Sequence, residues 1–304
     1  MVRGRTVPHM ADNESLFTLP IEAVVAPAKK TRRKNAQNKV VLGPRRPPVA
    51  APPSDPALLS VLEGLRDEMT SKIAARGHDG MQSFTRSQDA IRPVHKYVKL
   101  LLTRDGSIRA TWTGLEVNIQ TEWGNKKQDV VAQPGGFKKG TGESTLSIGV
   151  KGHLYGDGKN IINSFYSVRG ELTDFHEKHA QMVCGHVHVV ALSQWDPKAA
   201  KDKRVAFRRL TPGAVATIVH RYSRINGRTL ETLYRASSAE RTALLLVDFD
   251  QPVPLVYTNV ADLEADGWLD QGSKLTLNGV TLDGFVPDLL REHNLRFQGN
   301  HHLP

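Results

Sequence analysis

Several features that define common protein classes are scarce or absent in this sequence. One cysteine in 304 residues excludes a disulfide framework and a cysteine-rich zinc module. No apolar run reaches the roughly 18 residues that a membrane-spanning helix needs, and the amino-terminal stretch has no apolar core of a secretory signal. Phosphate-loop, dinucleotide, nucleophile-elbow and zinc-protease motifs are also missing. These absences favour a soluble protein of a reducing compartment that is not an enzyme and needs no cofactor.

Positive charge, in contrast, is abundant and unevenly placed. The chain has 41 Lys and Arg against 31 Asp and Glu, which gives a net charge of +10. Residues 29–46 contain no acidic residue, and prolines are frequent from residue 27 to residue 56. The cations of this cluster are Lys29, Lys30, Arg32, Arg33, Lys34, Lys39, Arg45 and Arg46.

This composition predicts a disordered, flexible basic arm over residues 1–53, because so few apolar groups cannot offset the entropy of ordering the chain. Clustered cations suit a phosphate backbone, since each neutralised phosphate releases condensed counterions. The arm has no aromatic residue between Phe17 and Phe84, so base stacking is not its mode of binding. We therefore expect single-stranded RNA as the partner, bound without sequence preference.

An amphipathic helix is expected next, within a segment of helix and linker over residues 54–93. Asp55 followed by Pro56 fits a helix start, and an apolar stripe then recurs at intervals of three and four residues. The stripe has two open partners: the body of the same chain, or a neighbouring copy in a homo-oligomer. Its residues are Leu58, Leu62, Leu65, Met69 and Ile73.

Residues 94–258 read mainly as short strands separated by turn signals, which predicts a mainly β fold, an antiparallel jelly-roll-like sandwich with a few short helices. Helices are expected at 212–222, 229–239 and near 286–293, and residues 259–304 as a C-terminal appendage. The expected strands are 95–102, 108–112, 115–122, 145–151, 161–169, 182–195, 204–210, 242–249, 253–258 and 275–282.

Two pairs of residues have spacings that metal sites use. His186 and His188 fall on one face of the strand expected at 182–195, together with Cys184. Asp248 and Asp250 lie at a strand end, where two carboxylates can bind a divalent cation at a subunit contact. A half-buried strand with a polar or subunit-facing surface accounts for the first pair, and a strand leaving the core accounts for the second. These structural interpretations are preferred to metal binding.

The order of basic arm, amphipathic segment and strand-rich body resembles the coat (capsid) proteins of small RNA viruses with jelly-roll shells. The resemblance is architectural and rests on the Lys29–Arg46 cluster and the strand-rich stretch at 94–258. It implies a viral structural protein that self-assembles in many copies and packages single-stranded RNA through its arm. It also implies a location in the virion and the host cytoplasm.

Three other classes fit parts of the same pattern. A viral movement protein and a cellular, ribosome-associated RNA-binding protein share the RNA partner, and a metal-dependent enzyme uses the histidines. Self-assembly into closed particles separates a coat protein from all three.

Overall fold

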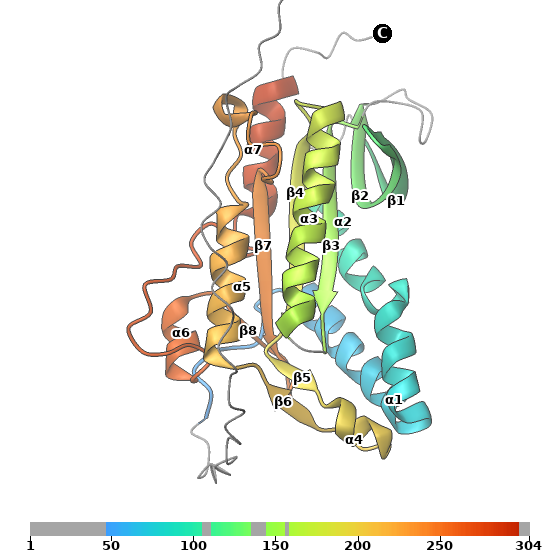
Figure 1. Ribbon diagram of the computed structural model, residues 1–304, viewed down its shortest axis with the longest axis vertical. Coiled ribbons are helices and arrows are strands. Elements are labelled where there is room, and N and C mark those ends of the chain that lie inside the picture. Colours follow the sequence, from blue (N-terminus) through green and yellow to red (C-terminus); the bar gives the residue numbers. More distant parts are fainter. Residues whose placement is uncertain (1–46, 105–110, 135–143, 156–157, 298–304) are drawn as a thin grey trace, which may run out of the picture. The chain divides into compact units, whose positions relative to one another are not determined.

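A six-stranded mixed sheet lies at the centre of the computed structural model, which describes residues 47–104, 111–134, 144–155 and 158–297 (Figure 1). The strand order is β1-β2-β3-β4-β7-β8. β4 is parallel to both of its neighbours, β3 and β7, whereas the other pairs are antiparallel. The strands are β1 (Thr111–Thr121), β2 (Gly124–Pro134), β3 (Leu146–His153), β4 (Val183–Ala191), β7 (Arg241–Asp248) and β8 (Leu255–Tyr257).

Parallel neighbours require crossover connections, and helices provide them. α3 (Gly158–Lys178) links β3 to β4, and α5 (Pro212–Arg224) precedes β7. Figure 1 shows both helices in front of the sheet. A second, two-stranded sheet of β5 (Ser193–Trp195) and β6 (Phe207–Arg209) follows β4, with α4 (Pro197–Lys201) between its strands.

Alternation along the strands divides the interior into two apolar layers, because successive side chains point to opposite faces. In β4, Val187 and Val189 belong to one layer, whereas Cys184 and Val190 belong to the other. α1 (Pro56–Arg86), α2 (Arg92–Arg104) and α7 (Phe285–Phe297) cover the first face; α3, α5 and α6 (Val260–Ala265) cover the second. Two short 3-10 helices span Gln88–Ala90 and Leu230–Thr232.

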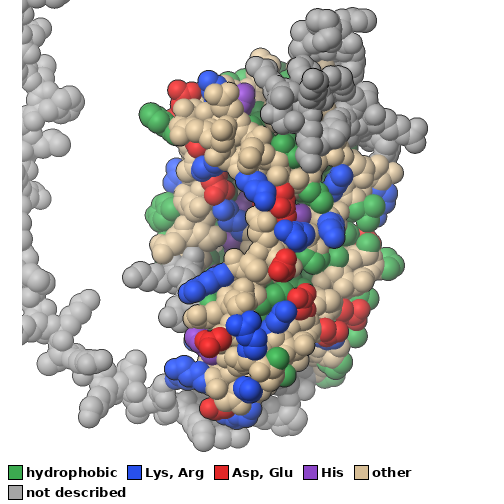
Figure 2. Space-filling model, turned by 90° about the vertical axis from the view of Figure 1, so that its right-hand side faces the viewer, with side chains coloured by type: hydrophobic (Ala, Val, Ile, Leu, Met, Phe, Trp, Pro, Cys, Tyr) green, Lys and Arg blue, Asp and Glu red, His purple; other side chains and the backbone are tan. Residues whose placement is uncertain are grey.

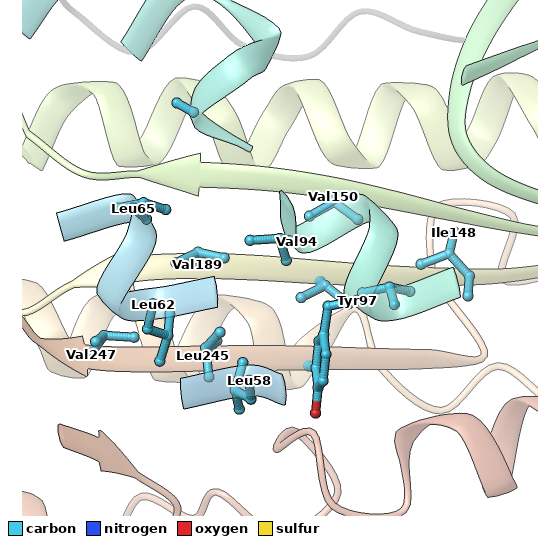
Figure 3. Packing of buried hydrophobic residues seen from close by; sticks show 14 of the residues in the cluster. Leu58, Leu62, Leu65, Val94, Tyr97, Ile148, Val150, Val189, Leu245 and Val247 are labelled. Atoms are coloured by element: carbon cyan, nitrogen blue, oxygen red, sulfur yellow. The ribbon is translucent and has the colours of Figure 1, made fainter. Parts of the chain in front are cut away.

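The apolar stripe of α1 packs into the core of its own chain. Asp55 caps the helix by accepting a hydrogen bond from the Ala57 N–H (2.9 Å), as the sequence predicts. In Figure 3, Leu58 and Leu62 lie beside Leu245 and Val247 of β7. The five stripe residues Leu58, Leu62, Leu65, Met69 and Ile73 are 0–6% exposed. Of the two partners open to the stripe, its burial favours the body of the same chain over the subunit contact.

Leu62→Ala is therefore expected to lower the free energy of unfolding by about 2–5 kcal/mol, because it leaves a cavity in a closely packed layer. Leu100→Ala is the matched control, since Leu100 is 45% exposed and its change should cost about 0.5 kcal/mol or less. Urea denaturation measures both. A loss at Leu62 that disappears when the protein is concentrated would instead assign the stripe to contacts between copies.

The predicted sheet is present, but the described residues form one mixed sheet with helices on both faces instead of an antiparallel sandwich. Two expected strands, 95–102 and 161–169, are helical and belong to α2 and α3. The expected strand at 275–282 is absent from the described structure, and the helix expected at 229–239 is reduced to one 3-10 turn. The helices expected at 212–222 and near 286–293 are confirmed as α5 and α7.

The expected segment boundaries at residues 94 and 259 do not divide the core. Residues 47–304 form one unit, separate from residues 1–46. α7, expected in an appendage, contributes Phe285 and Leu289 to the same apolar layer as α1. None of the described helices combines the length and the apolar character needed to cross a bilayer.

Candidate nucleic-acid interface

Helix α5 presents cations on its outer face. Thr211 caps its start, with Oγ1 accepting a hydrogen bond from the Ala214 N–H (3.3 Å). The apolar residues of the helix, among them Ile218 and Tyr222, are buried against the sheet. Arg221 and Arg224 lie in the last turn and are not among the buried residues of the helix. The partial negative charge of the helix end favours cations there.

Helix α3 adds a third guanidinium group beside them. Its buried stripe includes Phe165, Val168 and Leu172, which places Arg169 on the exposed side. The Arg169 Nη2 donates a hydrogen bond to Ser237 Oγ (3.2 Å) in the segment before β7. This bond holds the guanidinium group toward the space between α3 and α5.

A groove of about 500 Å³ lies between these elements. Phe165 and Ile225 supply its apolar part. The Arg221 guanidinium carbon lies 5.4 Å from the ring centroid of Phe165 and 5.7 Å from that of Tyr166, within the range of cation–π attraction. The polar lining consists of Arg169, His220, Arg221, Arg224, Ser237 and Ser238.

Some cations of the described surface are paired with carboxylates, whereas the three arginines of this groove are not. Lys126 pairs with Asp174 (3.6 Å) and Lys151 with Glu171 (2.8 Å). On the face shown in Figure 2, Lys and Arg side chains are interspersed with Asp and Glu. Among the described residues, no carboxylate forms an ion pair with any of the three groove arginines. The groove is therefore a site of uncompensated positive charge.

Guanidinium groups donate paired hydrogen bonds to phosphate oxygens, and they remain charged at any physiological pH. Three of them around one open groove, with serine hydroxyl groups beside them, suit a phosphodiester backbone. The helix expected at 212–222 contains Arg221. Residues 161–169 were expected to form a strand, so the sequence did not predict that Arg169 lies on a helix beside it. An arginine pair three residues apart on α5 was the only sequence signal for this groove.

The predicted RNA-binding residues Lys29, Lys30, Arg32, Arg33, Lys34, Lys39, Arg45 and Arg46 lie outside the described residues. Their role stays a prediction.

The candidate metal ligands His186 and His188 do share one face of β4, as expected. Their ring centroids are 5.7 Å apart, and the Tyr222 hydroxyl group lies 3.0 Å from His188 Nδ1. Burial, with a smaller contribution from Lys151, lowers the pKa of His186 to about 3, and burial lowers that of His153 on β3 to about 4. These imidazoles are therefore neutral at neutral pH. Neither His186 nor His188 belongs to a group of three potential ligands close enough to share one ion within the described chain.

Asp248, of the candidate pair Asp248 and Asp250, has a structural role at the end of β7. Asp248 is 4% exposed and accepts two hydrogen bonds, from the Asp250 N–H (3.0 Å) and from Gln251 Nε2 (3.1 Å). Its carboxylate thus holds the turn that ends β7. The structural interpretation of this pair accounts for its position.

No known protein family, no curated protein and no solved structure matches this chain. The evidence for its function is therefore the chemistry of its own residues.

Proposed function

We propose that this chain binds single-stranded RNA through two cationic elements, the groove between α3 and α5 and the cluster at residues 29–46. The observation that carries the proposal is the convergence of Arg169, Arg221 and Arg224 on one groove without an acidic partner among the described residues. Uncompensated guanidinium groups on a folded surface attract phosphates at long range and bind them on contact.

Two further features favour a nucleic acid strand over a small anion. The groove is open and large enough to follow a backbone, and Tyr166 at its side is 55% exposed. An exposed aromatic ring next to cations offers a surface on which an unpaired base stacks. The acid-free cluster extends the positive charge along the chain, which a single phosphate ion does not require. Contacts of this kind carry no sequence information, so binding is uniform across sequences.

The test is a triple variant of the full chain, Arg169→Gln with Arg221→Gln and Arg224→Gln. Each lost phosphate contact on a single strand reduces the slope of log affinity against log salt by about 0.7, so the triple change should reduce it by about 2. Fluorescence anisotropy with labelled RNA across a salt series measures this slope.

A matched control removes the same net charge elsewhere. Lys72, Arg92 and Lys127 are each paired with a carboxylate at the surface, and their replacement by glutamine should leave the slope nearly unchanged. If both triple variants reduced the slope of log affinity against log salt equally, RNA binding would depend on the net charge of the chain and not on the groove. An unchanged affinity in the groove variant would exclude the groove as an RNA site.

The coat-protein role predicted from the resemblance adds self-assembly to RNA binding and stays a prediction. Sizing of the full chain with and without RNA tests it, because a coat protein forms closed particles. A chain that remains monomeric at high concentration across salt and pH would be an RNA-binding protein of another kind, such as a movement protein or a ribosome-associated protein.

A further inference from the structure

Three potential metal ligands from three elements of the fold meet at the end of the sheet where β4 and β7 begin. His176 lies in the last turn of α3, Cys184 in β4, and Glu240 directly before β7. Their ligand atoms, one nitrogen, one sulfur and one oxygen, all lie within 4.8 Å of one another. All three residues are buried, with 2–4% of their surface exposed.

The histidine is oriented as metal-binding histidines are. Its Nδ1 donates a hydrogen bond to the Ala236 carbonyl oxygen (2.8 Å), which leaves Nε2 to face the other two residues. Nε2 is buried, and the side chains that it interacts with are those of Cys184 and Glu240. It lies 3.7 Å from Glu240 Oε2, too far for a hydrogen bond. Two ligands of one tetrahedral zinc ion are separated by about 3.3 Å, given bond lengths of about 2.0–2.1 Å.

The carboxylate is fixed with one oxygen toward the histidine. Glu240 Oε1 accepts hydrogen bonds from Nη1 of Arg228 and from Nη1 of Arg296. The other oxygen, Oε2, accepts the N–H of Cys184 (2.7 Å) and faces the imidazole. The two arginines therefore occupy the opposite oxygen and hold the carboxylate in place, as hydrogen-bonded neighbours of metal ligands do.

We propose that His176 Nε2, Cys184 Sγ and Glu240 Oε2 bind a zinc ion. Nitrogen, thiolate sulfur and carboxylate oxygen are the donors that zinc takes in proteins, and three of them leave one tetrahedral position for a water molecule. The ion would join the end of α3 to the starts of β4 and β7. It would therefore stabilise the folded chain, because it binds a site that the unfolded chain lacks.

The experiment is a titration of the full-length protein with cobalt(II), after removal of bound metal by a chelator under reducing conditions. The expected result is one Co²⁺ per chain, with a thiolate-to-cobalt charge-transfer band and the visible bands of tetrahedral cobalt, both lost on addition of Zn²⁺. Cys184 is the only cysteine of the chain, so the charge-transfer band identifies the sulfur ligand in the unmodified protein. Zinc should also raise the melting temperature.

Two variants and one control complete the test. Cys184→Ser should abolish the charge-transfer band, and His176→Gln should weaken cobalt binding at least tenfold. His179→Gln is the control, because His179 lies three residues further along the chain and its Nε2 donates a hydrogen bond to the Gln120 carbonyl oxygen (2.8 Å). This variant should bind cobalt as tightly as the unmodified chain does.

The absence of a thiolate band in the unmodified protein at one Co²⁺ per chain would overturn the proposal, whether or not the variants fold. An unchanged band in His176→Gln would remove His176 from the site. A loss of the band in His179→Gln would contradict the proposed ligand set, because His179 is not one of the three ligands. RNA binding by the groove is measured separately, so either proposal can fail alone.

Discussion

Replacement of the eight cations of residues 29–46 by glutamine should produce the largest loss of RNA affinity of any change to this chain. Eight cations neutralise up to about eight phosphates, so the slope of log affinity against log salt on a single strand should fall by about 6. The groove, with three arginines, accounts for a smaller part. The full-length variant is compared with the unmodified chain by anisotropy at several salt concentrations.

The control for this variant is a check that the protein still folds. Because the two apolar layers of the described structure contain none of the eight substituted positions, the circular dichroism spectrum and the melting temperature should not change. Combination with the groove variant should remove most of the remaining salt dependence. If the cluster variant binds RNA as tightly as the unmodified chain, the cluster is not the RNA-binding element, and its cations serve another role.

Acidification from about pH 6.5 to about pH 4.5 should destabilise the fold by about 2 kcal/mol for each buried histidine that stays neutral in the folded chain. Burial lowers the pKa of His153 to about 4, and burial, together with His186, His153 and Lys151, lowers that of His188 well below its usual value. The unfolded chain titrates near pH 6.5, so in this window it binds protons that the folded chain does not. The free energy of unfolding therefore decreases as the pH falls. Each such histidine contributes a decrease of about 1.4 kcal/mol for each pH unit below 6.5.

The groups that face these imidazoles offer no compensation. Lys151 is a cation paired with Glu171 (2.8 Å), and Tyr222 is neutral, because burial raises its pKa. A loss of this size is a large fraction of the total stability of many domains. Urea denaturation at a series of pH values measures it.

Substitution separates this effect from general acid denaturation. In this window the folded chain leaves His153 unprotonated whereas the unfolded chain protonates it, so His153→Gln should reduce the number of protons taken up on unfolding by about one. A stability that stays constant between pH 6.5 and 4.5 would contradict the neutral, buried state of these histidines.

The helices with complete local signals were predictable from the sequence. Asp55, Pro56 and the following stripe predicted the start of α1, and Thr211 with Pro212 predicted α5. α3 was missed although Ile161, Phe165, Val168 and Leu172 are spaced by four, three and four residues. The expected strand ended at residue 169, before the helical period was evident. The β-rich composition of this short segment therefore led to a strand prediction, although the longer apolar spacing is that of a helix.

Strand β2 was missed for the opposite reason. Its first half, beginning Gly124-Asn125-Lys126-Lys127, is polar, and its place in the sheet depends on pairing with β1. Such pairing is a property of the assembled sheet and leaves little trace in one segment. The groove arginines and the proposed zinc ligands could not be predicted from the sequence for the same reason, because each set is brought together only when the crossover helices pack on the sheet.

The alternation of histidine and valine in β4 has a consequence for how the sheet finds its alignment. A central strand between parallel neighbours often reads as a continuous apolar run, and such a run tolerates a shift by one residue without exposing polar groups. In β4, a shift by one residue would place His186 and His188 in the layer of Leu62 and turn Val187 toward Tyr222. The two imidazoles thus penalise misalignment, since each would lose its polar surroundings. Residues outside both proposed sites can in this way determine which alignment of the strands persists in the folded protein.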